Sequence, residues 1–172
     1  MDFKVRRTDA GEWLRLRTIR LAALTTDADS FGTTYERTEA TTDAAWQQLA
    51  ADGAQSPTTA MFAAVTSGGG WIAMSGASVN AEHPDETHVW GVYVVPEHRG
   101  GATGAALAVM DAARNWVRDH TTCSHITIHV TAANDHALAF YRRYGFVETG
   151  ESEPFVLDPT RTLLLMRYDI PR

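Results

Sequence analysis

The chain has 172 residues, of which 44% are hydrophobic and 21% are charged. This length fits one domain, residues 1–172, with a sizeable core, and the composition excludes an extended disordered chain. The formal net charge is −6, and the lack of a basic excess argues against nucleic acid as a partner. The charge suits a cationic substrate, although solubility alone explains it equally well.

Targeting and redox features indicate a cytoplasmic protein. The single cysteine, Cys123, excludes an internal disulfide and is typical of a reducing compartment. The N-terminal stretch "MDFKVRRTDAGEW" carries charges where a signal peptide needs an apolar core. No apolar run approaches the roughly 20 residues of a membrane span, so we expect no membrane partner.

The first half of the chain predicts a strand, two helices and three more strands. The strand covers residues 3–7, the first helix follows a cap at Asp9, and the second ends at Gly53. The later strands are separated by the turn sequences "SGGG" and "NAEHPDE", which is typical of an antiparallel meander. These strands are predicted at residues 59–66, 71–79 and 87–95.

The second half predicts a helix between two strands, then a helix and two final strands. A strand–helix–strand crossover inside an otherwise antiparallel sheet indicates a mixed α/β (α+β) domain. The last helix is predicted to be capped by Asn134 and stopped by Gly145. The elements, in order, are a helix at about 102–119, a strand at 125–130, a helix within 134–146, and strands at 146–150 and 160–168.

The stretch "VVPEHRGGATGAAL" (94–107) predicts a phosphate-binding turn. Its glycines allow a tight turn, the following helix offers unpaired N–H groups, and Arg99 adds a cation. A P-loop is excluded because no lysine follows Gly104, and a dinucleotide site is disfavoured because the glycine spacing differs. Taken alone, the turn is also compatible with a glycine-rich bend that holds no ligand.

This stretch resembles the acetyl-CoA loop of the GNAT N-acetyltransferase superfamily, R-G-x-G-x-G/A after a V-x-P strand end. Ala102 stands where that family most often has its middle glycine. The matching residues are Val94, Pro96, Arg99, Gly100 and Gly104. The resemblance implies that acetyl-CoA is held by Val92, Tyr93, Val94, Arg99, Gly100, Gly101, Ala102, Thr103, Gly104, Ala105, Asn134 and Tyr141.

A second stretch, "NDHALAFYRRYGF", resembles the downstream GNAT pattern N-x-x-A-x-x-x-Y-x-x-x-G-F at all five marked positions. Asn134 and Tyr141 are seven residues apart, so a helix presents both to the same groove. From the residues alone, Asn134 could be only a helix cap and Tyr141 a core aromatic. The resemblance implies a GNAT fold, with a mostly antiparallel sheet of six to seven strands flanked by about four helices.

The resemblance implies acetyl transfer from acetyl-CoA to a primary amine by direct attack in a ternary complex. Tyr141 would protonate the leaving thiolate, and a backbone N–H near Val94 would polarise the thioester carbonyl. For the general base the alternatives are His88, which titrates in the right range, Glu86 on the same strand face, and a water relay. A non-catalytic acyl-CoA-binding sensor or subunit is the competing interpretation.

By the same resemblance, segments 25–39 and 151–162 contact the acceptor, which is predicted to be a small-molecule amine, with a protein N-terminus or lysine as the alternative. Phe31, Tyr35 and Glu36 are the predicted contacts, since aromatics and carboxylates suit a cationic amine.

No metal site is expected. His125 and His129 share a strand face but lie about 13 Å apart, too far for one ion. A homodimer is an expectation at the level of the family, and no residue requires it.

Overall fold

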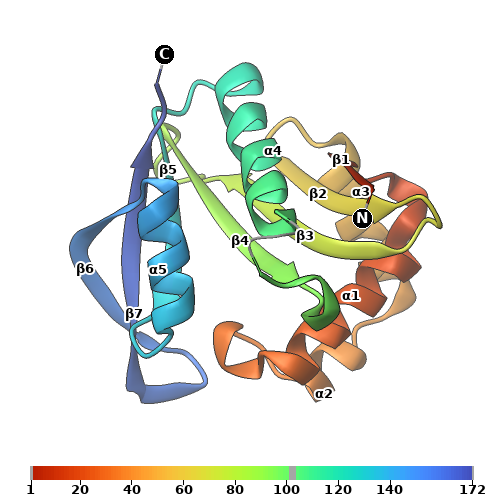
Figure 1. Cartoon of the computed structure of the whole chain (residues 1–172), viewed down its shortest axis with the longest axis horizontal. Coiled ribbons are helices and arrows are strands. Elements are labelled where there is room, and N and C mark those ends of the chain that lie inside the picture. Colours follow the sequence, from red (N-terminus) through yellow and green to blue (C-terminus); the bar gives the residue numbers. More distant parts are fainter. Residues whose placement is uncertain (1, 101–103, 172) are drawn as a thin grey trace.

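Seven strands form one sheet in the order β1-β2-β3-β4-β5-β7-β6, with helices on both sides (Figure 1). The computed structural model describes residues 2–100 and 104–171. The strands are β1 (Phe3–Arg7), β2 (Thr59–Thr66), β3 (Trp71–Val79), β4 (Glu86–Val94), β5 (His125–Thr131), β6 (Val147–Phe155) and β7 (Asp158–Asp169). The helices are α1 (Trp13–Thr26), α2 (Tyr35–Glu39), α3 (Asp43–Gln55), α4 (Ala105–His120) and α5 (Asp135–Tyr144).

The predicted fold class is confirmed. All strand pairs are antiparallel except β4 and β5, which are parallel and joined through α4. The described residues form five α-helices rather than about four, because the short α2 lies in segment 25–39, where the sequence predicts no helix. None of the described helices combines the length and the hydrophobicity of a membrane span.

The sheet is buried on both faces at β2, which explains its continuous apolar sequence. Phe62 packs with Trp116 of α4 on one side of the sheet. Met61 packs with Leu16 of α1 and Trp46 of α3 on the other. Helices α4 and α5 therefore cover one face, and α1 and α3 the opposite one.

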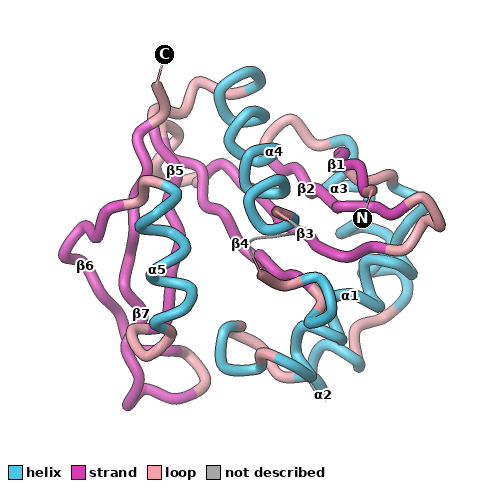
Figure 2. Tube along the Cα trace, viewed as in Figure 1, coloured by secondary structure: helices cyan, strands magenta, loops and turns pink. Residues whose placement is uncertain are grey.

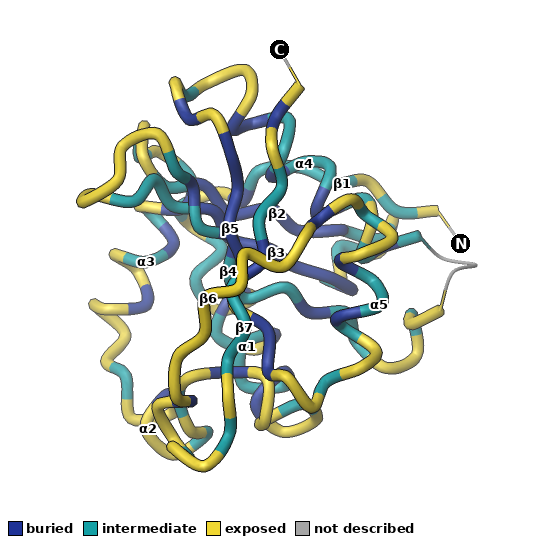
Figure 3. The backbone as a smooth tube through the Cα atoms, turned by 90° about the vertical axis from the view of Figure 1, so that its left-hand side faces the viewer, coloured by how far each residue is buried: buried dark blue, intermediate teal, exposed yellow. Residues whose placement is uncertain are grey.

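The last two strands form a longer hairpin than the sequence predicts. Strand β6 extends to Phe155 and β7 begins at Asp158, so most of segment 151–162 is paired strand rather than loop. Every side chain of β6 except Phe155 is exposed, as the edge strand in Figure 3 shows. An exposed edge strand lacks the alternation of apolar and polar residues that marks a half-buried strand.

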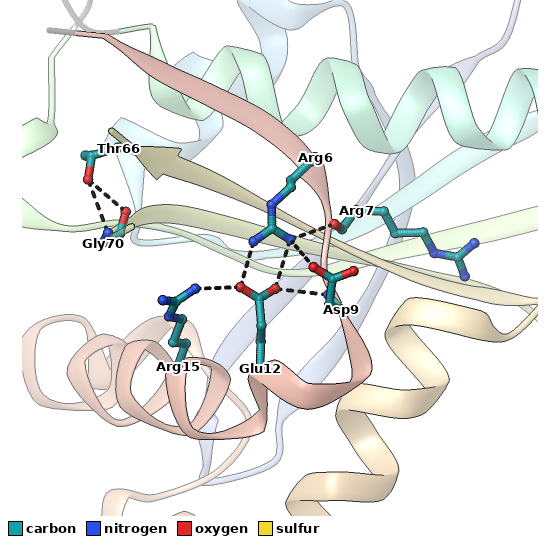
Figure 4. A network of polar contacts seen from close by, with 7 residues as sticks. All are labelled: Arg6, Arg7, Asp9, Glu12, Arg15, Thr66 and Gly70. Carbon is teal, nitrogen blue, oxygen red and sulfur yellow. Dashed lines mark hydrogen bonds and ion pairs between the residues drawn. The ribbon is translucent and has the colours of Figure 1, made fainter. Parts of the chain in front are cut away.

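The corner between β1 and α1 is held by a carboxylate, Glu12, that bonds two arginines (Figure 4). Arg6 donates to both oxygens of Glu12 at 2.6 and 2.8 Å, and Arg15 donates at 2.8 Å. The backbone N–H of Asp9 donates to the same carboxylate at 3.0 Å, which completes a capping box. The Arg6 bond, more than any other contact, lowers the pKa of Glu12 to about 2.

We expect the substitution Glu12→Gln to lower the free energy of unfolding by about 1–3 kcal/mol at pH 7, because charge-assisted bonds are lost. Thermal melting should show a decrease of about 3–10 °C. Since the folded-state pKa is depressed, this stabilisation is present above the unfolded value of about 4.3 and is lost as the pH falls toward 2. Equal melting temperatures of the two proteins at pH 7 would contradict this account.

Candidate active site

The sheet splits between β4 and β5. These strands are paired only where residues 86–88 of β4 face residues 125–127 of β5. Beyond that point the two strands diverge, as Figure 2 shows. The split exposes one edge of β4 in the middle of the sheet.

A β-bulge bends β4 at the start of the split. Met74 pairs with Tyr93 and Gly76 with Trp90, so β4 has one more residue than β3 in this interval. Gly91 lies in the bulge with φ 63°, a conformation that favours glycine. A Cβ at Gly91 would also lie 2.9 Å from Nη1 of Arg20.

A cavity of about 920 Å³ fills the split. It is lined by β4 and β5, by the first turn of α4, by α5 and by the segment after α1. Its lining includes Gly104 at the start of α4 as well as the aromatic side chains Phe31 and Trp90. The cavity therefore connects the glycine turn to an aromatic recess across the sheet.

The glycine-turn end is suited to an anion. Helix α4 has 16 residues, begins after Gly104 at φ 64°, and has no described side chain capping its N-terminus. Added Cβ atoms at Gly100 and Gly104 would meet nothing within 4 Å, so there is space beside the backbone. Unpaired N–H groups and the helix dipole favour a phosphate here.

Arg99 is fixed beside this turn. Its Nε donates to the carbonyl of Val94 at 2.9 Å, and its guanidinium forms an ion pair with Asp27. The predicted contacts Gly101, Ala102 and Thr103 lie outside the described residues.

The backbone N–H of Val94 faces the open edge of β4. The N–H of Val95 donates to the carbonyl of Ile72 in β3, and successive residues of a strand point their polar groups to opposite edges. The Val94 carbonyl, which accepts from Arg99, lies on the same edge as its N–H. Val94 therefore has the orientation expected of an oxyanion donor.

Tyr141 and Asn134 both line the cavity, as their spacing predicts. Asn134 caps α5 by accepting from the N–H of Ala137 at 3.0 Å, and its amide donates to Ser30 at 3.2 Å. Tyr141 is only 6% exposed, and burial raises the pKa of its hydroxyl. The hydroxyl is thus protonated at neutral pH and available as a proton donor.

His88 also lines the cavity, across the split from α5. Its Nδ1 lies 3.1 Å from Oγ1 of Thr127, and its ring contacts that of His129 at a centroid distance of 5.1 Å. Burial, with a smaller effect of His129, lowers the pKa of His88 to about 4. His88 is therefore a neutral imidazole at pH 7.

We expect the substitution His88→Gln to make folding stability less dependent on pH between about 6.5 and 4. The pKa of His88 is lower in the folded state than in the unfolded chain, so in wild type protonation favours unfolding as the pH falls through this window. The wild type should lose about 2–3 kcal/mol more than the variant over this range. Denaturant unfolding at several pH values measures the difference, with His83→Gln, an exposed histidine, as the control.

The structure does not bring Glu86 to the cavity. Its carboxylate accepts from Asn80 at 3.0 Å and lies 3.4 Å from Nε2 of His125. Burial raises the pKa of Glu86, but hydrogen bonds from Asn80, Thr127 and His125 outweigh this effect and lower it. Glu86 lies on the same strand face as His88, as predicted. Its carboxylate, however, already interacts with Asn80 and His125 and does not line the cavity.

Another part of the cavity lining holds an arginine close to two aromatic rings. The guanidinium of Arg20 lies 5.6 Å from the ring centroid of Phe31 and 5.9 Å from that of Trp90. Of the predicted acceptor contacts, Phe31 lines the cavity, whereas Tyr35 and Glu36 do not. Tyr35 donates to Glu39 on its own helix instead.

Comparison with known proteins identifies the fold and the family. The sequence profile of the Acetyltransferase (GNAT) family matches residues 20–146. The chain belongs to the GNAT acetyltransferase family. No curated protein sequence matches it.

Solved GNAT structures share its whole architecture at low sequence identity. An acetyltransferase from Streptococcus pneumoniae is 14% identical with a TM-score of 0.82, over 99% of this chain and 100% of that one. The putative acetyltransferase yncA from Salmonella typhimurium, solved with acetyl-CoA, is 16% identical with a TM-score of 0.79, over 100% and 96%. Spermidine N-acetyltransferase from Vibrio cholerae, solved with CoA and spermine, is 15% identical with a TM-score of 0.74, over 98% and 95%.

This GNAT chain thus gathers most of the predicted site around one split in its sheet. Sequence analysis missed Arg20 and Trp90, which the fold brings together, and the absence of a Cβ at Gly91 leaves room for the guanidinium beside β4. Among the described residues, no group of three His, Cys, Asp or Glu side chains could hold a metal. His125 and His129 have separate partners, Glu86 and His88.

Proposed function

We propose that this GNAT protein transfers the acetyl group of acetyl-CoA to a primary amine by direct attack in a ternary complex. The observation that carries the proposal is the split between β4 and β5. It places the Val94 N–H and the protonated Tyr141 hydroxyl on one cavity that also reaches the N-terminus of α4. An acyl donor with a phosphate at one end and a thioester at the other fits this arrangement.

Acetyl-CoA would be held mainly by backbone. The first turn of α4 and Gly100 would contact its pyrophosphate, and the exposed edge of β4 from Val92 to Val94 would pair with the pantetheine amides. The thioester supplies an activated acyl group, so no nucleophilic side chain of the protein is required. Cys123 is buried and does not line the cavity, which supports direct transfer.

In the proposed step, the amine nitrogen forms a bond to the acetyl carbonyl carbon and the carbon–sulfur bond breaks. The Val94 N–H stabilises the oxyanion that develops on the carbonyl oxygen. Tyr141 donates its proton to the departing CoA sulfur, which leaves as a thiol. The nitrogen loses its remaining excess proton, which returns through water to the Tyr141 oxygen and restores its hydroxyl, and the products are a neutral amide and CoA.

His88 is a weak base for this reaction, because its pKa of about 4 lies far below that of an alkylamine. We propose that the amine loses its first proton to water and that neutral His88 accepts a hydrogen bond from the amine or from a relay water. The rate should then rise with pH as the acceptor amine deprotonates, with no inflection near pH 4.

The test is release of free CoA thiol from acetyl-CoA in the presence of a panel of primary amines, with mass spectrometry of the products. We expect amine-dependent thiol release and a product heavier than the amine by one acetyl group. Binding of acetyl-CoA without turnover of any amine would instead support the non-catalytic sensor. The single cysteine supports a cytoplasmic location for this activity.

A further inference from the structure

The acceptor end of the cavity holds a half-buried cation, Arg20 of α1. The rings of Phe31 and Trp90 lie within 6 Å of its guanidinium carbon. Its Nη1 also lies 2.9 Å from the position that a Cβ of Gly91 would occupy, next to the bulge of β4. The positive charge therefore lies next to the middle of β4, on the wall of the cavity.

The described residues that line the cavity contain little negative charge to balance Arg20. Asp27 is the one carboxylate among them, and it is ion-paired with Arg99. Asp29 lies nearby in the chain but is paired with Arg161 at 2.9 Å. No carboxylate among the described residues forms an ion pair with Arg20.

An unpaired cation in a partly buried site is costly unless a ligand completes its interactions. Burial lowers the pKa of Arg20, yet a guanidinium stays protonated at neutral pH. Aromatic rings hold its orientation but offer no oxygen acceptors to its N–H groups. A carboxylate matches these N–H groups in a bidentate arrangement.

Building on the proposed function, we propose that Arg20 binds the carboxylate of the acceptor, which is therefore an amine that carries a carboxylate, such as a free amino acid. A polyamine carries only positive charges, which Arg20 would repel. The one carboxylate among the described lining residues, Asp27, is already paired with Arg99 and is not free to attract a polyamine. The pyrophosphate of acetyl-CoA has its own site at the first turn of α4. Spermidine N-acetyltransferase is only 15% identical to this chain, so the similarity indicates a shared fold and does not indicate a shared acceptor.

The experiment compares matched amines that differ by one carboxylate. Thiol release is measured with the twenty L-amino acids and with three pairs: phenylalanine and 2-phenylethylamine, tyrosine and tyramine, ornithine and putrescine. We expect kcat/KM for the carboxylated member of the preferred pair to be about 10- to 100-fold higher than for the other member, because only the carboxylate can form a charge-assisted bidentate bond with Arg20.

The variant Arg20→Met removes the charge and keeps the length of the side chain. It should raise KM for the carboxylated amine about 10- to 100-fold and leave the matched amine without a carboxylate nearly unaffected. Arg20→Lys should restore part of the preference. Arg118→Met, which removes an exposed charge near the C-terminal end of α4 and outside the cavity, should behave like wild type.

Two results would overturn the assignment. One is equal use of both members of each pair by wild type. The other is an equal decrease of kcat/KM for both members in Arg20→Met, which would mark a purely structural arginine.

A binding measurement separates failure of this assignment from failure of the proposed function. With CoA present, amino acids should raise the melting temperature of wild type and not of Arg20→Met, even if no acceptor is turned over. No shift with any of the twenty amino acids, while another amine is acetylated, would contradict the carboxylate site and leave the acetyltransferase proposal standing.

Discussion

The substitution Tyr141→Phe is expected to lower kcat for amine acetylation by about 10²- to 10⁴-fold, the usual contribution of a general acid. The hydroxyl lines the cavity and is kept protonated by burial, whereas phenylalanine has no proton to give to the leaving sulfur. No hydrogen bond joins this hydroxyl to another described residue, so its removal should leave no buried partner unsatisfied. Steady-state kinetics together with the Kd for acetyl-CoA measure the effect.

The matched control is Tyr168→Phe, which removes a hydroxyl from an aromatic residue of the same core that does not line the cavity. This control should retain the wild-type kcat. The Tyr141 variant should retain the wild-type melting temperature and acetyl-CoA affinity. A wild-type kcat in Tyr141→Phe would remove the proton donor from the mechanism, and a lost affinity would show that Tyr141 acts in binding.

The second large effect is expected from Ala106→Asp in the first turn of α4. Ala106 lines the cavity at the end where the pyrophosphate would bind. An acidic residue in the first turn of a helix normally stabilises it by about 0.3–1 kcal/mol, so the free protein should fold at least as well. The same charge repels a phosphate, and we expect the Kd for acetyl-CoA to rise about 100-fold.

Ala106→Asn is the matched control, since it adds nearly the same volume without the charge. Calorimetric titration with acetyl-CoA should show much weaker binding to the Ala106→Asp variant than to the Ala106→Asn variant. Equal affinities would mean that the anion does not lie at the N-terminus of α4. Equal and large losses would mean that added volume, not charge, blocks the site.

Local chemistry made much of this fold predictable. The Asn134 cap and the Gly145 stop of α5 depend on residues adjacent in sequence, and both occur as predicted, with Gly145 at φ 113°. The bounds of β2 and β3 follow from apolar runs between turn residues. The sequence predicts too short a β6, because the exposed side chains of this strand show no pattern of burial. Its length is set instead by pairing with β7.

The candidate site was only partly predictable for a related reason. The seven-residue spacing of Asn134 and Tyr141 is a property of one helix, and it correctly placed both at the cavity. Strand alternation correctly put Glu86 on the face of His88, but it could not reveal that Asn80 and His125 occupy the carboxylate. Likewise, nothing local indicates that Arg20 meets Trp90, because these residues come together only in the folded sheet.

The central claim is that the split between β4 and β5 binds acetyl-CoA, and thermal melting of the wild-type protein with acetyl-CoA, NADH and ATP tests it most directly. At 100 times its Kd, acetyl-CoA should add about 2.7 kcal/mol to the free energy of unfolding and raise the melting temperature by roughly 5–10 °C. NADH and ATP should give much smaller shifts. No shift with millimolar acetyl-CoA, or an equal shift with NADH, would contradict the account.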